Sequence, residues 1–208
     1  MTVSIYRVGA GVFTALVVVL QYWLQVRGLT GAAFLRTTIR FFSFFTILTN
    51  VLAAIALIIP GLAPRSWLGN CLSRPTVQTA VAGYMIMVGL VYYVLLAGLS
   101  HREGWQLVLE HILHAVTPPL FAIGWLAFVD KRDLDVGIGV RALVYPLAYG
   151  GYTLIHGAGT GWYPYPFLDV DELGYARVLV NIAGLVAAFV ALEALLAVVG
   201  RRLRIGAP

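Results

Sequence analysis

The segment with the clearest capacity for chemistry is Leu109–Leu120, which holds two histidines, His111 and His114, at the beginning of a long apolar run. Residues three apart lie on the same side of a helix, so the two imidazoles share one helical face. A titratable side chain inside membrane-spanning sequence is costly and by default marks a functional site. Because a neutral imidazole can accept a proton near physiological pH and return it, His114 is a candidate general base.

A second polar group interrupts the apolar segment 41–50. Its members are spaced i, i+3, i+6 and i+7, which forms a stripe on one helical face: Ser43, Thr46, Thr49 and Asn50. Such residues commonly join membrane helices by close packing and hydrogen bonds. Alternatively, one hydroxyl is a nucleophile, which needs a base within hydrogen-bond reach because a free hydroxyl reacts weakly.

Two prolines, Pro118 and Pro119, follow His114. Proline has no amide donor and its ring clashes with the preceding helical turn, so the pair predicts a distorted helix beside the histidine. We expect this distortion to open the bundle near His114 and to free backbone carbonyls.

A metal or haem site is an alternative use of the histidines. His111, His114 and His156 could supply three nitrogens, and haem could lie between His114 and His156. Zinc sites on one helix usually have histidines at i and i+4 with a glutamate between them, which is not the spacing here. The spacing therefore favours a site without metal or cofactor.

The composition is that of an integral membrane protein. The 208 residues are 61% hydrophobic and 11% charged, with a mean hydropathy of +0.89, whereas roughly 25% of the residues of a soluble domain are charged. Six helical spans of about 20 residues fill most of this length. The sequence predicts one all-α domain, residues 1–208, made of six transmembrane helices. Arginines in loops explain the net charge of +5, so no nucleic-acid partner is expected.

The six expected spans cover approximately residues 6–26, 41–59, 77–99, 107–129, 136–156 and 177–199. The connections include a short polar loop between Arg27 and Arg36, a loop at 100–105, a charged turn at 130–135 and a loop rich in glycine, proline and aromatic residues at 157–176. A basic tail, 201–204, ends the chain.

An even number of spans places both termini on one side, and the cations indicate which side. The terminal side collects nine: Arg7, Arg65, Arg74, Lys131, Arg132, Arg141, Arg201, Arg202 and Arg204. The opposite side has five: Arg27, Arg36, Arg40, Arg102 and Arg177. This excess predicts cytoplasmic termini. The single cysteine, Cys71, then lies on the reducing side.

This topology brings the polar stripe and the histidines to one depth in the outer leaflet. The aromatic loop Gly161–Phe167 lies on the same side and could roof a cavity, since irregular backbone is tolerated where protein buries it. Glu193 lies near the inner end of the last span, where we expect it to pair with an arginine such as Arg7 or Arg201.

Three motifs resemble a known family. The segment 41–50, the segment from His111 to Pro118 and the segment Gly161–Asp169 resemble the bacterial predicted six-span membrane protein family. That family is similar to the eukaryotic androgen-induced and androgen-dependent-TFPI-regulating membrane proteins, which are threonine hydrolases of fatty acid esters of hydroxy fatty acids. The resemblance implies Thr46 as the nucleophile and His114 as the catalytic histidine. If the alignment were shifted by one helical turn, the nucleophile would be Ser43 or Thr49 instead. His156 stands where bacterial relatives often have arginine.

The sequence therefore predicts a membrane-embedded lipid-ester hydrolase whose partner is a membrane lipid or fatty acyl ester. Asn50 and amides of the aromatic loop are candidate oxyanion donors, and His111 or Glu110 could orient His114. The loop side chains that could meet the substrate are Trp162, Tyr163, Tyr165 and Asp169. The alternative from another class is a non-enzymatic lipid-binding or transport protein that uses the same cavity. The clustering of titratable groups in one leaflet, rather than along a path across the membrane, favours the enzyme.

Overall fold

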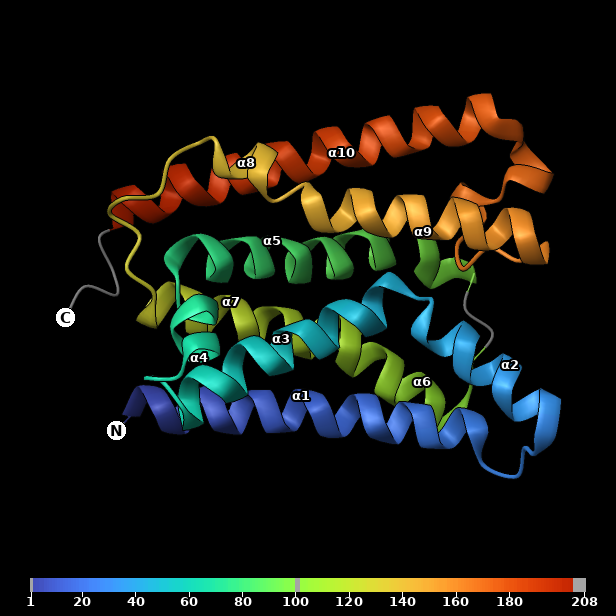
Figure 1. Ribbon diagram of the computed structural model, residues 1–208, viewed down its shortest axis with the longest axis horizontal. Helices are drawn as coiled ribbons and strands as arrows, with labels where there is room; N and C mark the ends of the chain where they lie inside the picture. The colour runs from blue at the N-terminus through green and yellow to red at the C-terminus, as the bar shows by residue number, and fades with distance from the viewer. Residues whose placement is uncertain (1, 100–101, 204–208) are drawn as a thin grey trace.

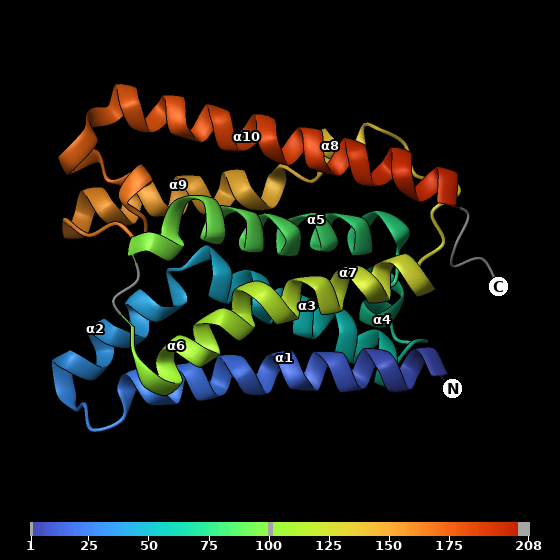
Figure 2. The ribbon, with the colours of Figure 1, turned by 180° about the vertical axis from the view of Figure 1, so that it is seen from behind.

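The protein is an all-α bundle, as expected. The computed structural model describes residues 2–99 and 102–203; Arg204 of the predicted basic tail and residues 100–101 of the predicted loop lie outside them. Most of the long helices lie side by side along one axis (Figures 1 and 2). The main helices are α1 (Thr2–Val26), α2 (Gly31–Phe42), α3 (Phe45–Leu62), α5 (Pro75–Val91), α6 (Gly104–His111), α7 (Thr117–Phe128), α9 (Val144–Thr160) and α10 (Val170–Leu203). Two shorter helices, α4 (Trp67–Leu72) and α8 (Ile138–Arg141), lie in connections.

Within the described residues, five helical stretches are long and apolar enough to cross a membrane. They are 2–26, 45–62, 75–99, 104–128 and 170–202. Large apolar side chains on their outer faces, such as Leu16 and Val180, are exposed, as they are where lipid rather than water is the solvent. These features identify a helical membrane protein. The predicted fifth span corresponds to α9, whose 17 residues are shorter than the other stretches.

Several predicted boundaries are wrong. The expected polar loop between Arg27 and Arg36 is largely the amphipathic helix α2, because its arginines and apolar residues follow a helical period. The fifth helix begins at Val144 rather than near 136, with Pro146 in its first turn, where a missing amide costs least. The expected loop 157–176 is shorter, because α9 continues to Thr160 before Gly161 ends it with a φ of 63°.

The two ends of the bundle differ in what they contain. We call the end where α1 begins and α10 finishes the terminal end, and the opposite end, where α1 finishes and α2 begins, the site end (Figure 1). Between them α1 and α3 lie close together. A side-chain Cβ on Gly11 would approach Ile58 Cγ1 to 2.6 Å, so the glycine permits the close helix contact.

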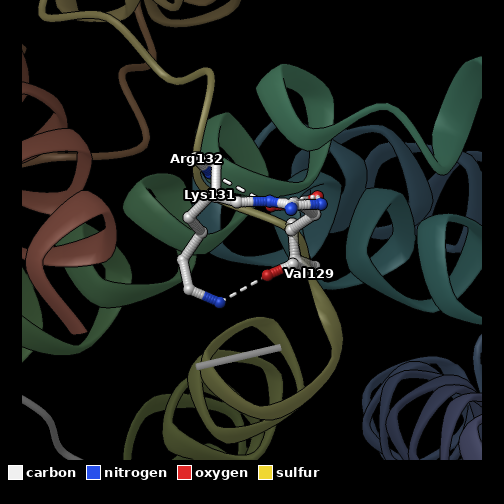
Figure 3. Close-up of polar contacts among 4 residues, drawn as sticks. Val129, Lys131 and Arg132 are labelled. Carbon is white, nitrogen blue, oxygen red and sulfur yellow. Dashed lines mark hydrogen bonds and ion pairs between the residues drawn. The ribbon is translucent and has the colours of Figure 1, made fainter. Parts of the chain in front are cut away.

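A buried lysine side chain stabilises the charged turn at the terminal end. Lys131 is only 2% exposed, and its Nζ donates to the carbonyls of Trp125, Leu126 and Val129 at 3.1, 2.9 and 2.5 Å. The last of these bonds is visible in Figure 3. Lys131 therefore adds a donor at the end of α7, where the last helical carbonyls lack the amides of a following turn. Its neighbour Arg132 is exposed and pairs with Asp130, which lowers the pKa of that carboxyl to about 2.

Glu193 of α10 is fully buried at the terminal end. Its two carboxylate oxygens have no hydrogen-bond partner among the described residues, so the predicted pairing with Arg7 or Arg201 is wrong. The carboxyl instead packs against Gly83 of α5, where a Cβ would lie 2.1 Å from Glu193 Oε1.

Candidate active site

The site begins at a break between two helices. The helix α2 ends at Ser43, Phe44 is extended with φ −82° and ψ 130°, and α3 begins at Phe45. Thr46 thus lies in the first turn of α3, where backbone amides have no partner within the helix. The predicted continuous span from 41 to 59 is wrong at this point, and the break is what presents Thr46 at a helix start.

Thr46 meets His114, as the sequence predicted. Thr46 Oγ1 lies 3.2 Å from His114 Nε2, and both side chains are 8% exposed. The other ring nitrogen, Nδ1, lies 2.7 Å from the main-chain carbonyl of Glu110. Because a carbonyl only accepts, Nδ1 carries the proton and Nε2 presents a lone pair to the Thr46 hydroxyl. The group that orients His114 is therefore the Glu110 backbone, neither the Glu110 carboxylate nor His111.

His114 lies in a widened helical turn. Residues Ile112–Val116 form a π-helix between α6 and α7, directly before Pro118 and Pro119. The prolines provide no amides, so carbonyls of this turn find other donors: Leu113 O accepts from Asn50 Nδ2 at 3.4 Å and lies 3.0 Å from Thr117 Oγ1. π-Helical turns are rare and frequently lie at functional sites. The predicted distortion is present, on the N-terminal side of the prolines.

The neighbouring helix α5 packs against His114 and the turn that holds it. It also turns π-helical, at Tyr92–Leu96, and the Tyr92 ring stacks on the His114 ring with centroids 3.8 Å apart and planes 19° apart. One turn earlier, Gly89 packs against the His114 backbone, since a Cβ there would lie 2.9 Å from His114 O. Together these contacts fix the imidazole plane.

The aromatic loop adds a hydroxyl to the site. Tyr165 OH accepts from the Thr46 backbone amide at 3.3 Å and lies 3.5 Å from Thr46 Oγ1. The ring is 7% exposed and stacks on Phe167 at a centroid distance of 5.2 Å. The hydroxyl, the Thr46 amide and the positive end of the α3 dipole therefore converge next to Thr46 Oγ1.

Two cavities meet at Thr46 and Tyr165. The larger, about 420 Å³, also adjoins Gln21, Arg102 and His114. The smaller, about 240 Å³, is lined mainly by apolar side chains of α5, α9 and α10. Thr46, Tyr165 and Leu96 line both. A molecule placed across this junction would present its middle to the Thr46 hydroxyl.

The rest of the predicted polar stripe serves helix contacts. Ser43 Oγ donates to Ile39 O or to Tyr152 OH, and Thr49 Oγ1 lies 3.1 Å from Tyr145 OH. Asn50 Nδ2 donates to Thr46 O at 2.9 Å, while Asn50 Oδ1 accepts from Thr117 Oγ1. Asn50 therefore joins α3 to the His114 helix and has no amide proton aimed at the cavities, so its predicted role as an oxyanion donor is wrong.

The histidines do not gather around one point. His111 is exposed, and its Nδ1 lies 3.2 Å from Tyr93 OH. His156 lies 5.9 Å from Trp162 between ring centroids. Among the described residues no group of three His, Cys, Asp or Glu side chains could hold a metal ion, so the three-histidine alternative has no geometric support.

Three of the four predicted loop contacts line neither cavity. Trp162 lies under the guanidinium of Arg40 at 4.9 Å. Tyr163 packs against Gly157 of α9. Asp169 Oδ1 accepts from the amides of Asp171 and Glu172, so it caps the start of α10. Only Tyr165 reaches the site.

The sequence analysis did not identify Tyr92, Gly89 or the Glu110 carbonyl as parts of the site. The Glu110 carbonyl could have been found from spacing, because His114 is four residues after Glu110 and a histidine in a helix can reach the carbonyl one turn earlier. No pattern within α5 distinguishes Tyr92 from Tyr93.

Comparisons with known proteins identify no relative of this chain. No family model, no curated protein and no solved structure matches the chain. The geometry of the site is therefore the basis on which the function is inferred.

Proposed function

We propose that the protein hydrolyses lipid carboxylic esters, with Thr46 as nucleophile and His114 as general base and acid. The observation that carries this proposal is the position of His114, held by a carbonyl at Nδ1 and facing the Thr46 hydroxyl with Nε2. An activated hydroxyl nucleophile needs this arrangement: a base within hydrogen-bond reach, oriented by a third group.

The reaction divides into two steps. As Thr46 Oγ1 bonds to the ester carbonyl carbon, its proton moves to His114 Nε2. The bond from that carbon to the alcohol oxygen then breaks, and Nε2 returns the proton to the departing alcohol. A water molecule next gives its proton to Nε2 and attacks the acyl-threonine; the Thr46 ester bond breaks, Oγ1 regains the proton, and a fatty acid leaves.

The negative charge that develops on the carbonyl oxygen needs donors. Tyr165 OH and the Thr46 amide adjoin the nucleophile, and the start of α3 adds a favourable dipole. The Glu110 carbonyl plays the orienting role that a carboxylate has in the Ser-His-Asp arrangement.

The test is labelling of the purified protein with a fluorophosphonate probe, followed by peptide mapping. We expect labelling at Thr46, its loss in His114→Ala, and its retention in the matched control His111→Ala. Absence of labelling in well-folded wild-type protein would overturn the proposal. Co-purified lipid without labelling would instead support the non-enzymatic lipid-binding alternative.

The proposal includes the family and substrate class suggested by the three motifs: the bacterial six-span membrane protein family, and fatty acid esters of hydroxy fatty acids or similar lipids, which are the substrates of the eukaryotic threonine hydrolases that this family resembles. Arg102, paired with Glu110 at 3.5 Å, gives the larger cavity a charged wall suited to a polar alcohol portion. Release of a free fatty acid and a hydroxy fatty acid from such an ester, by wild type but not by Thr46→Ala, is the expected result.

We further propose that α9 is a sixth crossing, with both termini cytoplasmic and the site toward the outer leaflet of a bacterial inner membrane. The start of α1 and the described end of α10 lie at one end of the bundle (Figure 1), as an even number of crossings requires. A membrane-impermeant maleimide applied to intact cells should not label the native Cys71. It should label Gly28→Cys in a Cys71→Ser background; the reverse pattern would contradict this topology.

A further inference from the structure

The smaller cavity has a wall without charged side chains. Its lining residues include no Asp, Glu, Lys, Arg or His. Val88 and Val91 contribute from α5, Leu147 and Leu154 from α9, and Ile182 and Val186 from α10. Such a wall accepts a hydrocarbon chain and disfavours a charged group, because burying an unpaired charge among apolar side chains is costly.

The larger cavity is also lined by many apolar side chains, but Arg102, Glu110 and His114 contribute to its wall, and none of these three lines the smaller cavity. In ester cleavage by Thr46, the imidazolium must reach the oxygen of the departing alcohol in order to protonate it. The alcohol therefore has to lie on the His114 side of the bond that breaks. The acyl group, attached to the same carbon, has to lie on the other side of Thr46.

We infer that the substrate binds in one direction, with its acyl chain in the apolar cavity between α5, α9 and α10 and its alcohol in the larger cavity, and that Gly150 and Gly151 determine the acyl chain length accepted. This inference rests on the proposed esterase function and adds to it the orientation and a specificity determinant.

The two glycines lie on the cavity face of α9. Leu147, Gly150, Gly151 and Leu154 occupy positions i, i+3, i+4 and i+7, which form one helical face, and all four line the apolar cavity. An added Cβ at Gly150 or Gly151 would meet no atom within 4 Å. Gly150 is partly buried and Gly151 is exposed, so the cavity is open to the surroundings of the bundle at these two glycines. A hydrocarbon chain can lie in this open space, and a larger side chain at either position would take up part of it without displacing the backbone.

Gly159 provides a matched control in the same helix. A Cβ at Gly159 also meets no atom within 4 Å, but Gly159 lines neither cavity. A leucine at Gly159 changes α9 composition in the same way as a leucine at Gly151, and leaves the cavity open.

The test compares kcat/KM for p-nitrophenyl esters from acetate to palmitate. Gly151→Leu should lower the value for palmitate by about tenfold or more, leave the value for acetate within about threefold, and shift the optimum to shorter chains. Gly150→Leu should act in the same direction, and Gly159→Leu should change neither value. An unchanged ratio of palmitate to acetate in both Gly150→Leu and Gly151→Leu would overturn the inference.

A second measurement does not depend on turnover. A fatty acid with a diazirine near its methyl end, photolysed with Thr46→Ala protein, should crosslink to peptides of α9 and α10, and the crosslink should weaken in Gly151→Leu. Crosslinks confined to α1 and α6, or none, would overturn the inference. If wild-type protein cleaves no ester but these α9 and α10 crosslinks form, the esterase proposal fails while the acyl cavity stands.

Discussion

The site end and the terminal end of the bundle each bury a titratable side chain in apolar helices, and they treat it differently. His114 has a partner at both ring nitrogens, an aromatic ring stacked on it and a cavity beside it. Glu193 is more deeply buried, yet its carboxylate has no hydrogen-bond partner in the described part of the chain and it lines neither cavity. Burial alone therefore does not make a site. Orientation by fixed partners and adjacent open volume distinguish the two ends.

The largest effect expected from this comparison concerns the reacting pair. Thr46→Ala and His114→Ala should each lower kcat for a soluble ester by about 10³-fold or more, and the double variant should lose little further activity, because the two residues act as one unit. Glu193→Gln should remain within a few-fold of wild type. If the two losses of kcat multiplied in the double variant, Thr46 and His114 would act independently, which would contradict the proposed pair.

The next effect concerns the hydroxyl that the aromatic loop contributes. Tyr165→Phe keeps the ring stacked on Phe167 and removes only the donor beside Thr46, so kcat should fall by about 10²-fold while KM changes little. Tyr163→Phe is the control, because Tyr163 is equally buried but lines neither cavity. Equal kinetics for the two variants would remove Tyr165 from the mechanism.

A smaller loss is expected where α5 supports the π-helical turn. In Gly89→Ala the new methyl meets the His114 carbonyl and should displace the imidazole, lowering kcat by about 10- to 100-fold, since small displacements of reacting groups are costly. Gly11→Ala also creates a tight contact, but between α1 and α3. It should lower the thermal midpoint and leave kcat of the folded protein nearly unchanged.

The smallest effect on activity is expected at the terminal end. Lys131→Met leaves carbonyls at the end of α7 without their donor and should lower the free energy of unfolding by roughly 1–3 kcal/mol, with kcat unchanged. Unfolding in mixed detergent with increasing dodecyl sulfate measures this loss. Arg132→Ala, which removes only an exposed ion pair, should shift the midpoint little; a larger shift for Arg132→Ala than for Lys131→Met would reverse our assignment.

The sequence was informative wherever one helix carries its own pattern. Long apolar runs predict the membrane bundle, and the prolines after His114 predict a distorted helix beside it. Both predictions follow from residues close together in the chain, where helical geometry fixes their relative positions. Depth along the spans predicts only that the hydroxyl stripe and the histidines lie at one level, and the resemblance is what selects Thr46 as the partner of His114.

The rest depends on contacts between helices that no local pattern specifies. The break at Ser43–Phe44 is unmarked by glycine or proline, and tertiary partners hold it: Tyr149 of α9 donates to Ser43 O at 2.9 Å. Tyr92 differs from Tyr93 only in the direction it faces. The amphipathic period of α2 is present in the sequence, but the arginines at 27 and 36 suggested a loop between them. Charge alone predicts an arginine partner for Glu193, whereas in the structure its environment is set by packing against Gly83.

The junction of the two cavities at Thr46 has a consequence for the order of events. In the proposed reaction, the hydrocarbon of an acyl group on Thr46 would close one route to it, so the water that releases this group would have to come by the path the first product used. The first product would then have to depart before hydrolysis, and we expect ping-pong kinetics. A small alcohol added to the medium would compete with water for the same space and divert the acyl group into a new ester.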